Sequence, residues 1–186
     1  MNILRRKHDR RTGTRREKTV RLTLCGLLTA IMLILGFVES LIPFSFGVPG
    51  IKLGLSNSVL IFAVYMLDIP AAFLLMAAKV TLSAMMFGAG LFSMPMWFAF
   101  AGGTLSTALM AVLSRDRDLK PTVVSMAGGV GHNVGQVIVC MLTVTRVNML
   151  FYMGVLMLVG MLTGGLTGLI AERVLRHMKV IRRVSH

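Results

Sequence analysis

The stretch TVVSMAGGVGHNVGQVIVCMLTV, residues Thr122–Val144, contains no Asp, Glu, Lys or Arg. A helix needs about 20 predominantly apolar residues to cross a hydrocarbon core of about 30 Å, and this stretch is long enough to do so. Its strongest polar residues, His132, Asn133 and Gln136, are grouped near its centre. The stretch therefore predicts a membrane-spanning helix that carries polar groups inside the bilayer.

Five other apolar stretches of similar length surround this one and are separated by turn signals: Leu22–Ile42, Ile51–Leu67, Ala71–Gly88, Met94–Leu113 and Met149–Ala171. The whole chain is 55% apolar and 15% charged, whereas soluble domains are about 45–50% apolar and about 25% charged. We therefore predict an all-α integral membrane protein, in which six transmembrane helices form one domain over residues 22–171. Basic tails, residues 1–21 and 172–186, flank this domain.

The net charge of +13 comes from 20 Lys and Arg residues against 7 Asp and Glu residues. With six spans, the two tails and the Arg115–Lys120 loop share one side of the membrane and carry nearly all the basic residues. The other side carries only Lys52 and Arg146. The positive-inside rule then predicts cytoplasmic termini in a plasma-membrane protein. Because topology and anionic lipid explain the basic surplus, we expect no nucleic-acid partner.

Lys79 is the one basic residue in the middle of a predicted span, where a lysine costs about 2.5–3.5 kcal/mol. Glu39, in the outer third of the first span, is the carboxylate at a comparable depth, so a Glu39–Lys79 pair is expected. Such a pair could belong to a solute-binding site or could simply hold two helices together. Lys79 could also extend its ammonium toward the interface.

In the fifth span, His132 and Gln136 are 40° apart around the helix at 100° per residue, with Asn133 at the edge of the same arc. Small residues occupy the neighbouring arc, which favours close helix packing. This polar flank either contacts a solute or forms a hydrogen-bond network between helices. In the sixth span, Gly160, Gly164 and Gly168 recur every four residues and also predict close packing.

An apolar connection, residues 43–50, follows the first span and leads into GIKLGLSN, Gly50–Asn57. It could cover a cavity or lie in the outer leaflet. Asn57 is about 9 Å below it along the second span. Lys52 could attract an anionic solute or contact lipid headgroups.

The sequence has no G-x-x-x-x-G-K-[ST] and no H-E-x-x-H motif. Its clustered carboxylates are Asp116 and Asp118, between arginines in a predicted cytoplasmic turn. We therefore predict that the protein is not an enzyme and that it holds no metal or cofactor.

GIKLGLSN (Gly50–Asn57) and GHNVGQ (Gly131–Gln136) resemble the Gx transporter family, whose members are also labelled heptaprenyl diphosphate synthase component I. Six spans, with small residues four apart at Gly26 and Ala30, resemble the substrate-binding S component of energy-coupling factor (ECF) transporters. This resemblance implies capture of a vitamin- or cofactor-like solute from outside, with a coupling subunit and two cytoplasmic ATPases as partners. Gly26 and Ala30 match the A-x-x-x-A patch that meets the coupling subunit, with glycine in place of the first alanine.

The leading hypothesis is therefore a solute-binding subunit of an ECF-type transporter. Its solute contacts are Glu39, Lys52, Asn57, Lys79, His132, Asn133 and Gln136. A second hypothesis is a membrane subunit of heptaprenyl diphosphate or quinone biosynthesis, with its reactive groups near the Arg115–Lys120 loop. A third is a structural subunit of a membrane redox complex, whose polar groups only pack helices together.

Overall fold

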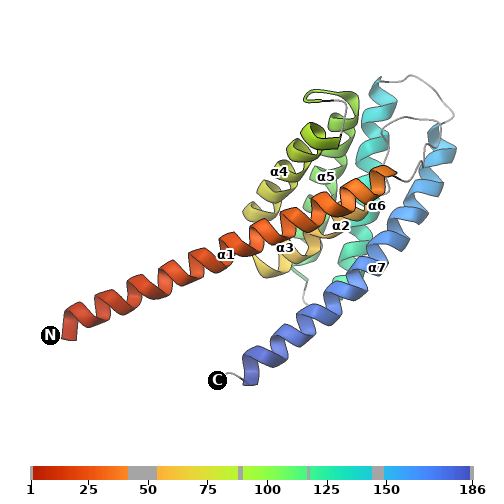
Figure 1. Cartoon of the computed structure of the whole chain (residues 1–186). Helices are drawn as coiled ribbons and strands as arrows, with labels where there is room; N and C mark the ends of the chain where they lie inside the picture. The colour runs from red at the N-terminus through yellow and green to blue at the C-terminus, as the bar shows by residue number, and fades with distance from the viewer. Residues whose placement is uncertain (1, 42–53, 88–89, 117, 144–148, 185–186) are drawn as a thin grey trace.

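The computed structural model describes residues 2–41, 54–87, 90–116, 118–143 and 149–184, and these residues form helices and no strand (Figure 1). The helices are α1 (Asn2–Leu41), α2 (Leu55–Ser58), α3 (Leu60–Met66), α4 (Ile69–Phe87), α5 (Met94–Leu113), α6 (Pro121–Thr143) and α7 (Met149–Val184). Within these residues, five helices are long and apolar enough to cross a membrane. The expected all-α membrane protein is confirmed.

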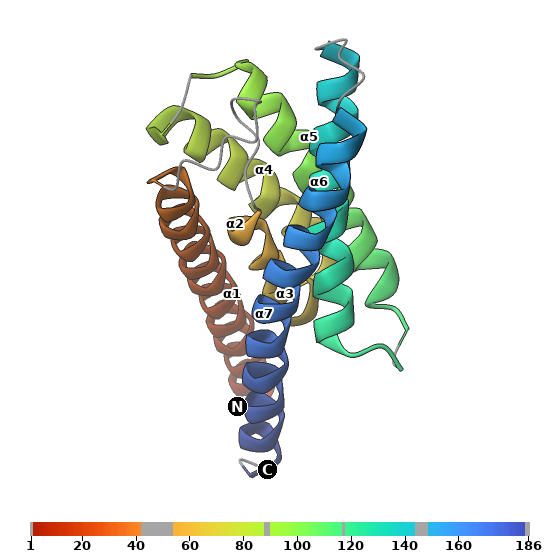
Figure 2. The ribbon, with the colours of Figure 1, turned by 90° about the vertical axis from the view of Figure 1, so that its right-hand side faces the viewer.

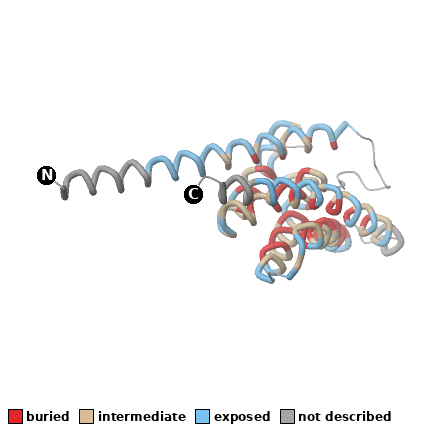
Figure 3. Tube along the Cα trace, turned by 90° about the horizontal axis from the view of Figure 1, so that it is seen from below, coloured by how far each residue is buried: buried red, intermediate tan, exposed pale blue. Residues whose placement is uncertain are grey.

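The two termini lie at the same end of the bundle, which we call the termini end (Figure 1). The other end, where α1, α4 and α6 finish and α5 and α7 begin, is the far end. Helix α6 lies between α5 and α7 and packs extensively against both, as Figure 2 shows from a second direction. Its central position makes α6 the most buried of the five long helices. Figure 3 shows that buried residues gather where the helices pack together, whereas the helix near the N-terminus is mostly exposed.

The predicted boundaries agree closely with three of the long helices. Helix α5 has the predicted bounds, and α4 and α6 differ from theirs by one or two residues. Pro95 lies in the first turn of α5, where its missing N–H costs no helical hydrogen bond. Helices α1 and α7 are longer than predicted, because each continues as a helix through its basic segment. Lys and Arg are good helix formers, so the helices do not end at the membrane boundary.

The structure corrects the length of the second predicted span, Ile51–Leu67. Residues 51–53 lie outside the described part, and the remainder forms the short helices α2 and α3, interrupted at Val59. Leu55–Met66 spans about 18 Å at 1.5 Å per residue, less than the hydrocarbon thickness. Gly54, which precedes α2, has a left-handed backbone with φ of 84°. The segment lies within the bundle, and Ser56 to Ile61 are all buried.

The glycines of α6 and α7 bring the two helices into backbone contact, as predicted. A Cβ atom at Gly129 would lie 2.0 Å from the backbone oxygen of Gly160. A Cβ at Gly164 would lie 2.4 Å from the oxygen of Ser125, and one at Gly168 would lie 2.7 Å from Thr122 Cα. No larger residue fits these positions while the helices stay in place. The fold therefore depends on close packing of α6 against α7.

A polar contact marks the termini end between α1 and the turn before α4. Asp68 Oδ1 accepts a hydrogen bond of 2.9 Å from the backbone N–H of Ala71, in the first turn of α4. Arg21 on α1 forms a salt bridge with Asp68 Oδ2. The Ala71 hydrogen bond and the Arg21 guanidinium both hold the pKa of Asp68 below its ordinary value.

Candidate functional site

A chain of four buried polar side chains runs between α4, α2 and α6. Lys79 Nζ on α4 donates a hydrogen bond of 2.8 Å to Asn57 Oδ1 on α2. Asn57 Nδ2 lies 2.6 Å from His132 Nδ1 on α6, and Gln136 Nε2 lies 2.7 Å from His132 Nε2. None of these residues is more than 6% exposed. The structure thus brings together four of the residues selected from the sequence, and we call them the polar chain.

Two glycines hold the imidazole of His132 in place. A Cβ atom at Gly54 would lie 2.6 Å from His132 Cδ2, and one at Gly102 on α5 would lie 2.6 Å from His132 Nδ1. Both distances are far below an ordinary van der Waals contact, so a side chain at either position would displace the ring. Sequence reasoning missed both glycines. Gly54 lies inside the GIKLGLSN stretch, but nothing in the sequence placed Gly102 beside His132.

Glu39 supports the backbone just before α2. Its Oε1 accepts a hydrogen bond from the backbone N–H of Gly54, a peptide group that precedes α2 and has no helical partner there. Its Oε2 is buried without a hydrogen-bond partner among the described atoms. The described salt bridges are Arg21–Asp68 and Arg176–Glu172, so the expected Glu39–Lys79 pair is not among them. Glu39 instead supports the backbone that carries Asn57 toward His132.

Asn133 points away from the polar chain. Its Nδ2 donates a hydrogen bond to the backbone oxygen of Leu156 on α7. Its Oδ1 is buried and has no hydrogen-bond partner within the described part of the protein. The neighbouring side chain, His132, faces α2 and α5 instead. The position of Asn133 at the edge of the predicted polar arc thus places it on the α7 side of the helix.

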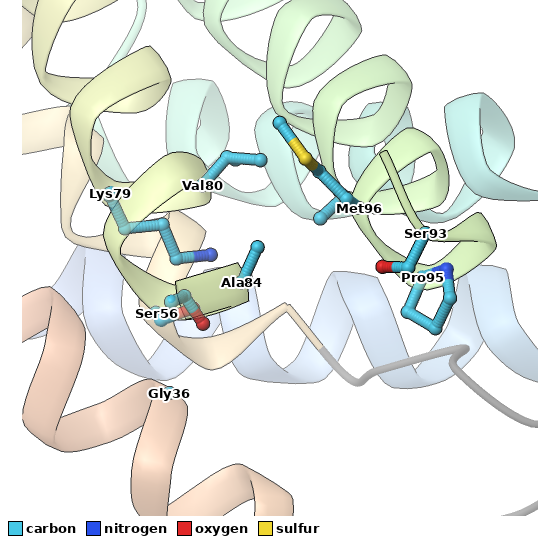
Figure 4. A pocket seen from close by; sticks show the side chains of 10 residues that line it. Gly36, Ser56, Lys79, Val80, Ala84, Ser93, Pro95 and Met96 are labelled. Carbon is cyan, nitrogen blue, oxygen red and sulfur yellow. The ribbon is translucent and has the colours of Figure 1, made fainter. Parts of the chain in front are cut away.

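A cavity of about 40 Å³ lies beside Lys79, between α1, α2, α4 and the start of α5 (Figure 4). In this view the Lys79 side chain reaches across the cavity above Ser56, and Pro95 and Met96 of α5 lie on its other side. Its described polar lining consists of Lys79 and three serines, Ser56, Ser83 and Ser93, and includes no carboxylate among the residues that the structure describes. This volume accommodates a few water molecules or one small polar group.

The three serines of this cavity were not selected from the sequence. Ser56 is the neighbour of Asn57, and Ser83 follows Lys79 by four residues, so it lies on the same face of α4. Those two spacings were signals that could have revealed them. Ser93 precedes α5 and carries no comparable signal.

A second cavity, of about 250 Å³, lies near the termini end, beside the loop between α5 and α6. Its lining includes two carboxylates and two basic side chains: Asp118, Glu172, Lys120 and Arg176. Tyr65 also lines it, and the Tyr65 hydroxyl is buried without a hydrogen-bond partner among the described atoms.

The candidate docking residues, Gly26 and Ala30, lie apart from the described lining of both cavities. Gly26 and Ala30 are on an exposed face of α1, and a Cβ at Gly26 would have no heavy atom within 4 Å. This face is therefore open toward lipid or a partner. Lys52 lies outside the described residues.

A protein-family model described as heptaprenyl diphosphate synthase component I matches residues 28–174 of the chain. These residues include α4, α5 and α6, the segment that carries Asn57, and therefore the whole polar chain. No curated protein and no solved structure matches the chain.

Proposed function

The chain belongs to the heptaprenyl diphosphate synthase component I family, and we propose that it is a membrane subunit that binds a small-molecule solute between its helices. The polar chain from Lys79 to Gln136 is the observation that carries this proposal. It joins three helical segments inside the bundle and ends at Lys79 beside a cavity. Ionisable and amide groups at this depth are expensive, and in membrane proteins they mark binding sites and solute pathways.

Helix packing alone does not account for so many polar groups. Close contact between the helices already comes from glycines such as Gly129 and Gly160. A lysine near the bilayer centre costs about 2.5–3.5 kcal/mol on insertion scales. A packing network of uncharged side chains would avoid that cost. The presence of Lys79 within the polar chain therefore supports a binding role.

The short helices α2 and α3 also support the proposal. Membrane transporters form their substrate sites from discontinuous helices whose irregular backbone lies inside protein. Here the interrupted segment is buried by its neighbours and supplies Ser56 and Asn57 to the site.

We further propose that the solute enters from outside and is taken up with the help of partners. The distribution of basic residues predicts cytoplasmic termini, and with that orientation the cavity beside Lys79 would be reached from the other side. The exposed face with Gly26 and Ala30 is a surface where a coupling subunit could approach α1 closely. Uptake would then depend on partner ATPases, because the sequence has no phosphate-binding loop of its own.

The proposal is tested with the full chain purified into lipid nanodiscs. Bound molecules are released by denaturation and identified by mass spectrometry, for the wild type, for His132→Gln and for Thr143→Ala, an exposed change on the same helix. We expect one small molecule on the wild type and on Thr143→Ala, and at least about a tenfold loss with His132→Gln. The absence of any bound molecule, with no thermal shift from vitamins, flavins, quinones or prenyl phosphates, would overturn the proposal.

A second candidate function is a membrane subunit linked to heptaprenyl diphosphate synthesis. The family description and the larger cavity beside Asp118 and Lys120 favour it. In that case, membranes containing the protein would incorporate labelled isopentenyl diphosphate into prenyl chains. Asp118→Ala would reduce this transfer, whereas His132→Gln would not. No difference between membranes with and without the protein would exclude this candidate.

A further inference from the structure

The larger cavity, beside the loop between α5 and α6, lies where the membrane-spanning segments end. Helix α3 ends at Met66, α6 begins at Pro121, and the sixth predicted span ends at Ala171; residues at or next to these three ends line the cavity. Arg176, the lining residue farthest along α7, lies about 7.5 Å beyond Ala171 at 1.5 Å per residue. The headgroup layer on each side of a bilayer is about 5–8 Å thick. With the sixth span ending as predicted, the cavity is level with the lipid headgroups.

A tyrosine hydroxyl at this cavity has no hydrogen-bond partner among the described atoms. Tyr65 is in the last turn of α3 and lines the cavity, and its hydroxyl oxygen is buried. A phenol hydroxyl both donates and accepts hydrogen bonds, and a buried polar group without a partner is costly. The cavity has room for such a partner, so Tyr65 indicates a ligand that carries a polar atom.

The four charged side chains of the cavity differ in how far they are already engaged. Glu172 Oε2 accepts a hydrogen bond of 2.7 Å from Thr122 Oγ1, and its Oε1 accepts one of 2.5 Å from Arg176. These contacts engage both oxygens of Glu172 but only one guanidinium nitrogen of Arg176. Asp118 and Lys120 are exposed, and neither is in a salt bridge within the described part of the chain. One carboxylate and two cationic groups therefore remain for a ligand.

We propose that this cavity binds a zwitterionic group in which a phosphate and a primary ammonium are joined by a short linker, as in the headgroup of an ethanolamine phospholipid. A ligand with only negative charge would leave Asp118 facing a like charge. One with only positive charge would leave Lys120 and Arg176 in that situation. A group that carries both charges avoids the repulsion. The inference goes beyond the functions proposed above and rests on neither of them.

Each part of such a headgroup has a partner in the lining. The ammonium pairs with the Asp118 carboxylate, and the phosphate pairs with Lys120 and Arg176. The Tyr65 hydroxyl donates to a phosphate oxygen, which supplies the partner that it lacks among the described atoms. A choline headgroup has no N–H and cannot donate to Asp118, so the site distinguishes a primary from a quaternary ammonium.

The size and the apolar lining of the cavity agree with a ligand of this kind. At about 250 Å³ it is just smaller than the sites of about 300–1,000 Å³ that enclose a whole drug-sized molecule. It therefore suits a headgroup or a similarly small soluble zwitterion. Leu119, Pro121 and Leu175 complete its described lining and give carbon atoms of the ligand an apolar surface.

The test identifies the lipid that the full chain retains. The protein is prepared in nanodiscs with equal amounts of phosphatidylethanolamine, phosphatidylcholine and phosphatidylglycerol, and native mass spectrometry identifies the lipid still bound after its release from the disc. In parallel, the unfolding temperature is recorded in discs of phosphatidylcholine alone, with added O-phosphoethanolamine or inorganic phosphate. The first measurement detects a lipid ligand and the second a soluble one.

Two of the three variants have a matched control in the same loop. Asp118→Asn is compared with Asp116→Asn, and Lys120→Gln with Arg115→Gln, because Asp116 and Arg115 are exposed and are not in the described lining. Tyr65→Phe removes only the buried hydroxyl.

We expect the wild type and both controls to retain phosphatidylethanolamine over the other two lipids by at least about fivefold. Asp118→Asn and Lys120→Gln should each reduce this preference by at least about threefold, because each removes a charge-assisted hydrogen bond. Tyr65→Phe should reduce it as well, yet leave the unfolding temperature in phosphatidylcholine discs unchanged, since the hydroxyl has no partner among the described atoms.

Equal retention of the three lipids, a preference for phosphatidylglycerol, or unchanged retention in Asp118→Asn and Lys120→Gln overturns the inference. If no lipid is retained but O-phosphoethanolamine stabilises the wild type more than Asp118→Asn, and inorganic phosphate does not, the zwitterionic assignment holds with a soluble ligand. If neither a lipid nor O-phosphoethanolamine binds, the inference fails. The polar chain shares no residue with the described lining of this cavity, so the solute-binding function is tested separately.

Discussion

Asn57 on the short helix α2 and His132 on α6 are in contact through Nδ2 and Nδ1, 2.6 Å apart. Each belongs to one of the two sequence stretches that first suggested a site, GIKLGLSN and GHNVGQ. Lys79 lies on one side of this contact and Gln136 on the other. The contact therefore connects the two halves of the polar chain.

Replacing Asn57 with alanine should destabilise the protein. The change removes the acceptor for Lys79 and the donor for His132, and each buried polar group left without a partner costs about 1–3 kcal/mol. Thermal unfolding in nanodiscs would show a lowered transition temperature, while Ser40→Ala, an exposed change, would leave it unaltered. Equal transitions for Asn57→Ala and wild type would contradict the hydrogen bonds described.

Gly102→Ala should disturb the position of His132 in particular. The added Cβ would lie 2.6 Å from both the ring Nδ1 and the backbone oxygen of His132, so α5 or α6 must shift. Such overpacking costs about 1–3 kcal/mol. Gly26→Ala is the matched control, because its Cβ would have no heavy atom within 4 Å. We expect Gly102→Ala to lose both thermal stability and any solute that the wild type binds, and an unaffected variant would be evidence against this packing.

Gly129→Ala should separate α6 from α7. The new Cβ would be only 2.0 Å from the backbone oxygen of Gly160, and a backbone cannot move aside as a flexible side chain can. Gly154→Ala on α7, which has open space around it, is the control. Limited proteolysis and thermal unfolding should both show a weakened bundle for Gly129→Ala alone. Identical digestion patterns for the two variants would argue against close contact here.

We predict that the protein loses stability in acid when Asp68 becomes protonated. The pKa of Asp68 in the folded protein is below its ordinary value of about 3.9, chiefly because of the Ala71 hydrogen bond and then Arg21. The contribution of ionised Asp68 to the stability of the folded protein is therefore complete above about pH 4. It disappears as the pH falls through the pKa of Asp68 in the folded protein. Unfolding temperatures measured from neutral pH downward should differ between wild type and Asp68→Asn, and the difference should close in acid. If the difference in unfolding temperature between the two proteins stays constant below pH 4, ionisation of Asp68 is not its source.

The orientation of the bundle in the membrane is also testable. In a chain with Cys25→Ser and Cys140→Ala, a single cysteine is placed by Leu91→Cys at the far end or by Asp116→Cys at the termini end. The distribution of basic residues predicts that an impermeant thiol reagent labels intact cells only at position 91. Labelling at position 116 alone would place the termini outside.

The sequence predicted the elements well, because apolar length and turn residues determine helices in a membrane. It predicted α5 to the residue, and it identified Lys79, Asn57, His132 and Gln136 as polar groups inside the bundle. It could not predict their partners. Which face of a helix meets which neighbour depends on rotation and depth, and helical periodicity gives neither. For this reason the sequence did not reveal that the backbone N–H of Gly54 donates a hydrogen bond to Glu39.

The length of the second predicted span was overestimated for a related reason. Hydropathy detects the apolar run up to Leu67 but not the left-handed backbone of Gly54, which begins α2 well inside the protein. Likewise, no sequence pattern predicts that Gly102 contacts His132, because that contact depends on how α5 and α6 pack.

The brevity of Leu55–Met66 also affects how the protein is made. A segment of that length gives the insertion machinery too little apolar surface to be threaded into the bilayer alone. When Asn57 is added to the growing chain, Lys79 and His132 have not yet been synthesised, so neither of its partners is present. The segment gains its full support only after α4 and α6 have been synthesised, and the polar chain is therefore completed late in biogenesis.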